Sequence, residues 1–338
     1  MKSKNKHTRT LAIIGILAPV LFFISLNAGY MDLNIGDIMR ILTGGGSAKE
    51  NLFVLEFRMP RIVIAMLVGM GLSLAGCVIQ SITRNPLADP GILGINAGAG
   101  IIVIIFILLN GTLTFASTFA LPFLSFLGAA LTGCIIYGLS LNKKTGMQPT
   151  RLVLNGVAIQ AGINAFMTLI VIQLDDTQHD FLVKWQAGSI WSSNWELVAA
   201  LLPWIAIGII ILIFNAKKLD VLSMGDEISC GLGVTVSHEK RKLLFTAMAL
   251  AAASVASSGS ISFVGLMAPH LSRRLVGARH GILIPTCALV GALLVLAADT
   301  VARTIAKPSE IPTGVVVSLL GAPYFICLLI SNRKKSLK

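Results

Sequence analysis

The sequence contains few charged residues. Asp, Glu, Lys and Arg make up only 12% of its 338 residues, about half of the share found in typical soluble domains. A soluble protein of this length needs more charge to cover its surface, so the composition argues against a soluble enzyme and against a disordered chain. Hydrophobic residues make up 55% and the mean hydropathy is +0.84, which favours a polytopic membrane protein.

Motifs for catalysis and metal binding are also missing from the sequence. None of the five cysteines lies within four residues of another, which argues against a zinc site and against a disulfide framework. The sequence lacks the HExxH, GxSxG and GxxxxGK(S/T) patterns of metalloproteases, hydrolases and P-loop ATPases. No carboxylate falls in the middle of a long apolar run, which disfavours an ion-coupled transporter. We therefore expect no catalytic residue and no bound metal, and active transport would need energy from another chain.

Ten apolar runs are long enough to cross a hydrocarbon core as helices, which predicts an all-α membrane protein. The seventh and eighth runs are short, and only Ser258-Gly259-Ser260 separates them. Residues 11–332 are expected to form a single transmembrane domain between short basic tails at 1–10 and 333–338. The runs cover residues 11–28, 62–82, 92–109, 115–141, 152–174, 197–214, 243–258, 261–276, 282–298 and 311–330.

The distribution of basic residues predicts the orientation of these helices. With the N-terminus on the cytoplasmic side, the loops that lie inside contain 20 of the 27 Lys and Arg residues. Basic loop residues favour the cytoplasmic side of a membrane, so we predict that both termini are cytoplasmic. The net charge of +12 has the same explanation, and the sequence has no basic runs interleaved with aromatics that would indicate a nucleic-acid partner.

The longest predicted cytoplasmic loop spans residues 215–242, with short helices expected at about 216–240. Two glycines bracket one or two helical turns, and two acidic residues in the first turn suit the helix dipole. Two apolar residues spaced by four share one helix face. Such a helix suits docking into a groove of another protein, and an ordinary connector on the membrane explains the pattern equally well. The residues concerned are Met224, Gly225, Asp226, Glu227, Ile228, Leu232 and Gly233.

Three arginines, Arg58, Arg61 and Arg303, stand at the predicted outer ends of spans. Pro60 suits the start of the second span because its missing N–H costs nothing there. The planar guanidinium group suits recognition of carboxylates, so these arginines could meet an acidic external partner. Anchoring of span ends in lipid headgroups is the common alternative.

The fifth run contains a stripe of polar side chains at Gln160, Asn164 and Thr168, which are spaced by four and share a helix face. The stripe could line a path for a hydrophilic ligand. Interhelical hydrogen bonds, worth about 0.6–2 kcal/mol each, explain the same pattern equally well. Asn155 falls on nearly the opposite face and is expected to serve packing.

Several strings in combination resemble one family. RMPR at 58–61 leads into the second span, and RNPLADPGILG follows at 84–94. GSISFVGL at 259–266 precedes Pro269 and His270. The remaining strings are ADTVAR at 298–303, EIPTG at 310–314 and GAPYF at 321–325. Together they resemble the iron-siderophore and vitamin B12 (FecCD-type) permeases of ABC importers, from about residue 11 to residue 332.

The resemblance implies a ten-helix type II ABC importer permease in a bacterial cytoplasmic membrane. Such permeases work as pairs of membrane subunits, with two cytoplasmic ATPase subunits that bind ATP and Mg²⁺ and an external binding protein that delivers the ligand. The chain itself would bind no cofactor and catalyse no reaction. A pair with a different second permease is expected, rather than a pair of identical chains.

The resemblance also implies roles for residues. The segment from Met224 to Val234 would contact the ATPase, and the three outer arginines would meet glutamates of the binding protein. The fifth span would line the translocation path, with Pro149 and Thr150 at its cytoplasmic gate, where Pro149 replaces the small hydroxyl residue common in relatives. Structural motif positions would be Asn85, Pro86, Gly94, Gly265, Pro269, His270, Pro312 and Gly314.

The expected function is therefore import of a ferric siderophore, of the hydroxamate type as a further guess, by alternating access. The same machine carrying cobalamin or haem is the main alternative, and nothing in the sequence separates these cargoes. A secondary transporter or a membrane scaffold is a third hypothesis. A co-purifying ATPase would exclude it.

Overall fold

The computed structural model describes residues 2–28, 34–110, 115–142, 146–190, 193–306 and 310–336. These residues form an almost entirely helical chain, so the all-α prediction is confirmed. Two short strands, β1 (Leu141–Asn142) and β2 (Gly146–Met147), pair antiparallel. The helices are α1 (Lys2–Asn27), α2 (Ile35–Leu42), α3 (Ala48–Asn51), the π-helical turn η1 (Leu52–Arg58), α4 (Met59–Thr83), the 3₁₀ turn η2 (Pro90–Leu93), α5 (Ile95–Asn110), α6 (Phe115–Ser140), α7 (Pro149–Val171), α8 (Asp176–Gln186), α9 (Trp195–Phe214), α10 (Ala216–Ser223), α11 (Asp226–Gly231), α12 (Val236–Ser258), α13 (Val264–Val276), α14 (His280–Ile305) and α15 (Thr313–Ser336).

Each of the ten predicted runs coincides with one helix: α1, α4, α5, α6, α7, α9, α12, α13, α14 and α15. The short break after Ser258 is present, because Gly259 and Phe263 both have positive φ angles, of 67° and 68°, which no helix continues through. The helix that follows has 13 residues, about 20 Å, which is too short to cross a hydrocarbon core alone.

The structure differs from the prediction in one longer helix and in three short helices that were not predicted. Helical structure runs without interruption from Ala48 through η1 into α4, so about three extra turns precede α4. Helices α2, α3 and α8 were not expected, because each is shorter than a membrane span and none is a long apolar run.

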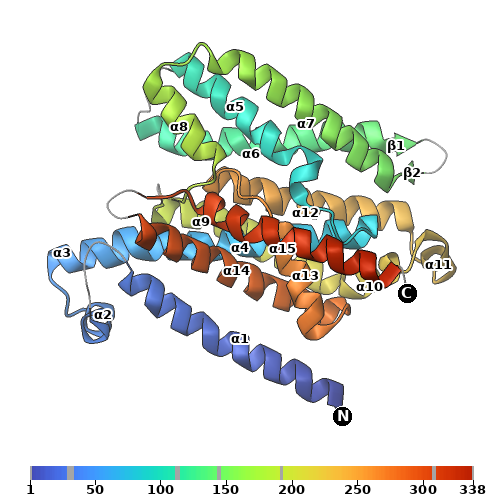
Figure 1. The fold of residues 1–338 in the computed structure, drawn as a ribbon, viewed down its shortest axis with the longest axis horizontal. Helices are drawn as coiled ribbons and strands as arrows, with labels where there is room; N and C mark the ends of the chain where they lie inside the picture. The colour runs from blue at the N-terminus through green and yellow to red at the C-terminus, as the bar shows by residue number, and fades with distance from the viewer. Residues whose placement is uncertain are drawn as a thin grey trace.

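The helices form two groups, which Figure 1 shows one above the other. The first group contains α4, α9, α13 and α14 together with the terminal helices α1 and α15, and the second contains α5, α6, α7 and α8. Helix α12 lies between the groups and packs on α4 on one side and on α6 on the other.

The first group contains several contacts in which helix backbones touch. A Cβ atom added at Gly69 would collide with the backbone of Gly291, and one added at Gly291 would collide with Gly69. Gly76 meets the backbone of Gly265 in the same way. Small residues allow helix backbones to approach this closely, so α4 is in backbone contact with both α14 and α13.

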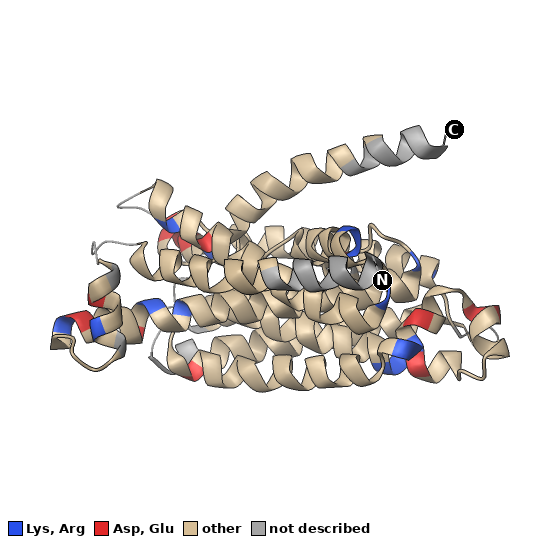
Figure 2. Ribbon diagram, turned by 90° about the horizontal axis from the view of Figure 1, so that it is seen from below, with Lys and Arg blue, Asp and Glu red and all other residues tan. Residues whose placement is uncertain are grey.

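Charged residues gather toward the two ends of the molecule, and uncharged residues fill the region between them (Figure 2). One end, here called the arginine end, carries α2, α3, the start of α4 and the end of α14. The opposite end, here called the coupling end, carries α10 and α11. Helix α1 begins and α15 ends toward the coupling end (Figure 1), as expected when both termini share one side of the membrane. That this side is cytoplasmic stays a prediction.

Candidate functional site

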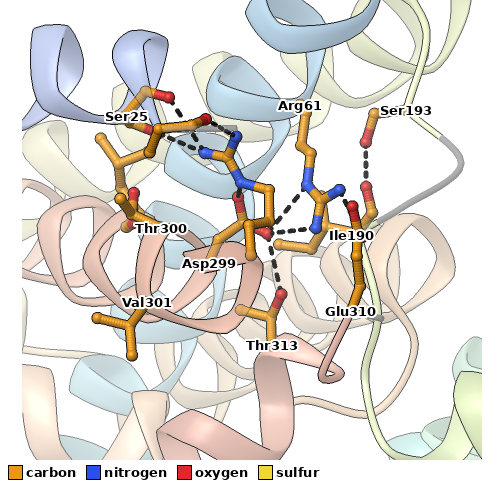
Figure 3. Close-up of polar contacts among 12 residues, drawn as sticks. Ser25, Arg61, Ile190, Ser193, Asp299, Thr300, Val301, Glu310 and Thr313 are labelled. Carbon is orange, nitrogen blue, oxygen red and sulfur yellow. Dashed lines mark hydrogen bonds and ion pairs between the residues drawn. The ribbon is translucent and has the colours of Figure 1, made fainter. Parts of the chain in front are cut away.

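At the arginine end, Arg61 holds two carboxylates. Its Nε and Nη2 atoms donate to Oδ1 of Asp299 at 3.1 and 3.0 Å. Its Nη1 atom donates to Oε2 of Glu310 at 2.8 Å. Figure 3 shows both carboxylates directed at the one guanidinium, with the Thr313 hydroxyl also donating to Asp299, at 3.1 Å. Asp299 is fully buried, whereas the side chain of Glu310 is 47% exposed.

The other two arginines tie the same cluster to α1. Arg303 forms an ion pair at 2.9 Å with Asp299, which lies one turn earlier in α14. Its guanidinium also donates to the Ser25 hydroxyl at 2.7 Å and to the carbonyl of Ala28 at 3.1 Å. Arg58 donates to the carbonyl of Leu26 at 2.7 Å. The last turn of α1 is therefore fixed to η1 by Arg58 and to α14 by Arg303.

This geometry bears on the expected contact with an external protein. Arg58, Arg61 and Arg303 are only 7%, 9% and 7% exposed, and each already has a partner within the chain. An external carboxylate would have to displace one of these partners, and Glu310 is the exposed one. Contact of these arginines with a binding protein stays a prediction.

At the coupling end, α11 is fastened by its first residue. Asp226 accepts hydrogen bonds from the buried amine of Lys240 at 2.7 Å through both carboxylate oxygens, and Arg84 lies 3.9 Å away. Gly225 precedes the helix with φ of 119°, a conformation that suits glycine alone. Asp226 and Gly225 therefore orient the short helix rather than form its outer surface.

Three exposed apolar side chains lie on α11 and at its two ends. Met224, Ile228 and Leu232 are 59%, 52% and 61% exposed, and Glu227 is exposed beside them. Gly233, with φ of 80°, ends the turn. The predicted short helix between two glycines, with Ile228 and Leu232 on one face, is therefore present. An apolar face this exposed on a charged end of the molecule indicates a contact surface.

A second polar cluster at the coupling end had not been expected. Oδ1 of Asp220, on α10, accepts from the backbone N–H of His280 at 2.8 Å and lies 2.7 Å from Nδ1 of the same residue. Nε2 of His280 lies 2.7 Å from the hydroxyl of Ser81, near the end of α4. These three side chains, here called the His280 bridge, join α10, α14 and α4.

The family motifs at 84–94 and 259–270 meet at the end of α4. The side chain of Asn85 accepts a hydrogen bond from the backbone N–H of Leu87 at 3.0 Å, which closes a tight turn around Pro86. Gly265 faces the ring of Pro90, and a Cβ there would lie 2.5 Å from that ring. These strings are thus one structural joint, formed by two segments distant in the sequence.

Gln80 and Asp89 complete this joint. The amide of Gln80 donates to the carbonyl of Gly265 at 3.1 Å and accepts from Arg273. Asp89 accepts from the backbone N–H of Gly91 at 2.8 Å, which starts η2 before the left-handed Gly94. Burial raises the pKa of the Asp89 carboxyl from 3.8 to about 6, although the Gly91 hydrogen bond opposes the rise.

The remaining motif residues lie on α13 and at the start of α15. Pro269 is buried within α13, and the ring of His270 packs edge-on against Tyr324 of α15 with centroids 5.9 Å apart. Gly314, two residues after Pro312, donates its backbone N–H to the carbonyl of Gly188 at 2.9 Å. These contacts support the structural roles expected from the resemblance.

Helix α7 carries the predicted path residues. Asn164 and Thr168 are exposed and Gln160 is half-buried. Only 17% of an 18-residue apolar stretch of this helix is buried. Pro149 occupies the first turn of α7, and Thr150 beside it is exposed. Asn155 donates to the Ser140 hydroxyl of α6 at 3.1 Å, as expected for a packing residue. The stripe therefore faces away from the chain, and its role stays a prediction.

Comparisons with known proteins agree with this arrangement. The FecCD transport family matches residues 17–331. The iron(3+)-hydroxamate import system permease protein FhuG of Bacillus subtilis is 46% identical over 98% of this chain and 99% of its own. The hemin transport system permease protein HmuU of Yersinia pestis is 36% identical over 99% of both chains.

A solved structure of a metal-chelate type ABC transporter in an inward-facing conformation superposes with a TM-score of 0.85. It covers 96% of this chain and 99% of that chain, at 31% identity. A family match over most of the sequence and a shared fold over nearly the whole chain lead to one conclusion. The chain belongs to the FecCD transport family, and it is a permease subunit of an ABC importer.

Proposed function

We propose that this permease carries ferric siderophores, with ferric hydroxamates as the first class to test. The observation that supports this cargo is the 46% identity to an iron(3+)-hydroxamate permease over 98% of the chain. The Fe(3+)-citrate permease YfmE of Bacillus subtilis, at 38% identity over 99% of the chain, points to the same chemical class of chelated ferric iron. Transport proceeds by alternating access in the cytoplasmic membrane of a bacterium.

The proposed assembly pairs this chain with a second permease subunit, a different one rather than a copy. The mostly exposed α7 and the exposed apolar side chains of α15, such as Leu319 at 73% and Leu320 at 55%, support a partner against these helices. Asn164 and Thr168 on α7 then line the path between the two subunits. A polar lining lets a hydrophilic chelate pass without strong binding.

Two ATPase subunits dock on the coupling end, and they bind ATP and Mg²⁺. The exposed apolar face formed by Met224, Ile228 and Leu232 supports this contact, because an apolar helix face suits a groove in a partner protein. An external binding protein delivers the chelate to the arginine end. The half-exposed Glu310 on Arg61 is the carboxylate that an acidic partner would replace there.

Uptake of radiolabelled iron tests the cargo. Cells that lack this gene and complemented cells are compared with ferric hydroxamate, ferric citrate, haem and labelled cobalamin in parallel. We expect loss of a ferric siderophore signal and its return on complementation. Intact iron uptake with loss of haem or cobalamin uptake would contradict the proposed cargo while leaving the importer assignment in place.

A further inference from the structure

The α4 and α14 helices connect the two charged ends of the molecule. At the arginine end, Arg61 of α4 binds Asp299 of α14. At the coupling end, Ser81 of α4 contacts His280 of α14. Buried polar contacts thus join the same two helices at both the arginine end and the coupling end.

Between these ends, the two helices have no room to slide. Gly69 and Gly291 are in backbone contact, and the hydroxyl of Ser73 donates across to the carbonyl of Cys287 at 2.8 Å. A packed contact of backbone on backbone transmits displacement because interiors are dense and resist compression. We therefore treat the α4–α14 pair as one rigid body.

Helix α10, which leads into α11, is attached to this pair through Asp220. One carboxylate oxygen receives both the first backbone N–H of α14 and the Nδ1 side of the His280 ring. A carboxylate is favoured at a helix N-terminus by the free N–H groups and the helix dipole. His280 is 3% exposed, so loss of either partner would leave a buried polar group unpaired, which destabilises this arrangement.

The order serine, histidine, aspartate resembles the triad of a hydrolase, but the surroundings differ. The Ser81 hydroxyl is buried and donates to the carbonyl of Cys77, one turn earlier, at 2.7 Å. A nucleophile must reach a substrate carbon, and this oxygen faces the interior of a helix pair. The cluster is therefore suited to holding helices together.

We propose that the His280 bridge makes α10 and α11 move as one body with the α4–α14 pair, and that His280 is a positioning residue for coupling of ATP hydrolysis to transport. The proposal rests on the proposed contact between α11 and the ATPases. Without the bridge, the ATPase displaces α10 and α11 while the membrane helices lag behind. Hydrolysis then continues with less transport per ATP.

The test uses the complete importer, with its ATPases and binding protein, reconstituted in liposomes. Hydrolysis and uptake of radiolabelled ferric siderophore are measured together for Asp220→Leu and His280→Leu. We expect transport per ATP to fall at least about fivefold, with hydrolysis at half or more of the parent rate. Asp220→Asn keeps the oxygen that accepts both bonds, so it should stay within about twofold of the parent. His179→Leu, on the exposed surface of α8, is the matched control and should leave the ratio unchanged.

A cargo-independent measurement separates failure of this proposal from failure of the proposed cargo. Spin labels at the exposed positions Lys217 and Gly281 report the distance between α10 and α14. The parent complex should give one narrow distance distribution with and without ATP, and Asp220→Leu should broaden it. Unchanged coupling and an unchanged distribution in Asp220→Leu would overturn the proposal. If the leucine variants do not assemble, Ser81→Ala takes their place, with a fall of at least about twofold expected and an unchanged ratio as the contrary result.

Discussion

Two apolar regions of this chain are packed very differently. In the α4–α14 pair, 83% of an 18-residue apolar stretch of α4 and 56% of such a stretch of α14 are buried inside the chain. In the second group, the corresponding values are 39% for α6 and 17% for α7. Hydropathy alone does not account for burial, because α9 has the highest mean hydropathy of these helices, 2.9, and only 28% of its apolar stretch is buried. Lipid and a protein core are equally apolar. Both regions contain a backbone contact between glycines, Gly69 with Gly291 and Gly98 with Gly128. The buried ion pair of Arg61 with Asp299 is therefore the feature that distinguishes the α4–α14 pair.

The two regions also use polar residues differently. In the first, Arg61, Asp299 and His280 are buried and bound to neighbours. In the second, Asn164 and Thr168 are exposed on a helix face that the chain leaves uncovered. Buried polar contacts hold the first region in one arrangement. Exposed ones suit the second region to line a path and to change its neighbours.

The largest expected effect comes from breaking the arginine cluster. Asp299→Asn leaves Arg61 and Arg303 buried without their shared carboxylate, and removing one partner of a buried ion pair costs about 3–5 kcal/mol. We expect purified protein to lose at least 10 °C of thermal stability in detergent, or to fail to accumulate. Glu310→Gln, which changes a half-exposed partner of the same arginine, should cost about 1 kcal/mol or less. Equal losses in the two variants would show that burial does not distinguish the regions.

The glycine contact between α4 and α14 gives the next effect. Gly69→Val inserts a side chain where backbone touches backbone, and such overpacking costs about 1–3 kcal/mol. A Cβ at Gly162 on α7 meets no atom within 4 Å in this chain, and valine is a better helix former than glycine. Gly162→Val should therefore be neutral or stabilising by up to about 0.5 kcal/mol. Thermal unfolding of both variants measures the difference. A larger loss in the α7 variant would reverse the comparison.

A smaller effect is expected at the joint between the regions, where Asp89 precedes η2. The folded state raises the pKa of its carboxyl from 3.8 to about 6, so it binds the proton more tightly than the unfolded state does. This group therefore favours folding below pH about 4, and its contribution is lost as the pH rises through 6. Asp89→Asn keeps the cap to Gly91 without the ionised form.

We expect Asp89→Asn to be more stable than the parent at pH 7.5, by about 1 to 2 kcal/mol. The difference should vanish near pH 4. Melting temperatures across this range make the measurement, with Asp180→Asn, an exposed position on α8, as the control. Parallel pH profiles for parent and Asp89→Asn would contradict a buried, proton-binding carboxyl.

The smallest effect on stability is predicted for the exposed stripe of α7. Replacing Asn164 and Thr168 together by alanine should change the unfolding free energy of the chain by less than about 0.5 kcal/mol, because the Thr168 hydroxyl bonds only to the Asn164 carbonyl. Siderophore uptake should fall several-fold in the same variant. A stability loss with normal uptake would place the stripe in packing instead of the path.

Much of the fold could be predicted from the sequence. Hydropathy located all ten long helices, and the loop charges placed α10, α11 and both termini at one end. Two short helices also had a detectable signal, because Ser47 with Glu50 and Asp175 with Gln178 form capping boxes. That pattern is recognisable before a helix start.

The partners of the site residues could not be predicted in the same way. The pairing of Asp299 with Arg303 is local, since the two are four residues apart, whereas Arg61 lies 238 residues from Asp299. Likewise, 60 residues separate Asp220 from His280. The sequence shows that these polar residues lie at the ends of spans, where they can contact other polar groups. Whether they face lipid headgroups, an external partner or each other depends on packing of distant segments.

The most direct test of this account is a distance measurement on the working importer. Spin labels at Lys217 and Val301 span the rigid region from α10 to the far end of α14, and labels at Ile172 and Val301 join α7 to α14; all three positions are exposed. Between the resting and the ATP-bound complex, we predict a change of less than about 2 Å for the first pair and more than about 5 Å for the second, as in rigid-body transitions. A change in the first pair as large as that in the second would contradict a rigid α4–α14 pair that moves with α10 and α11.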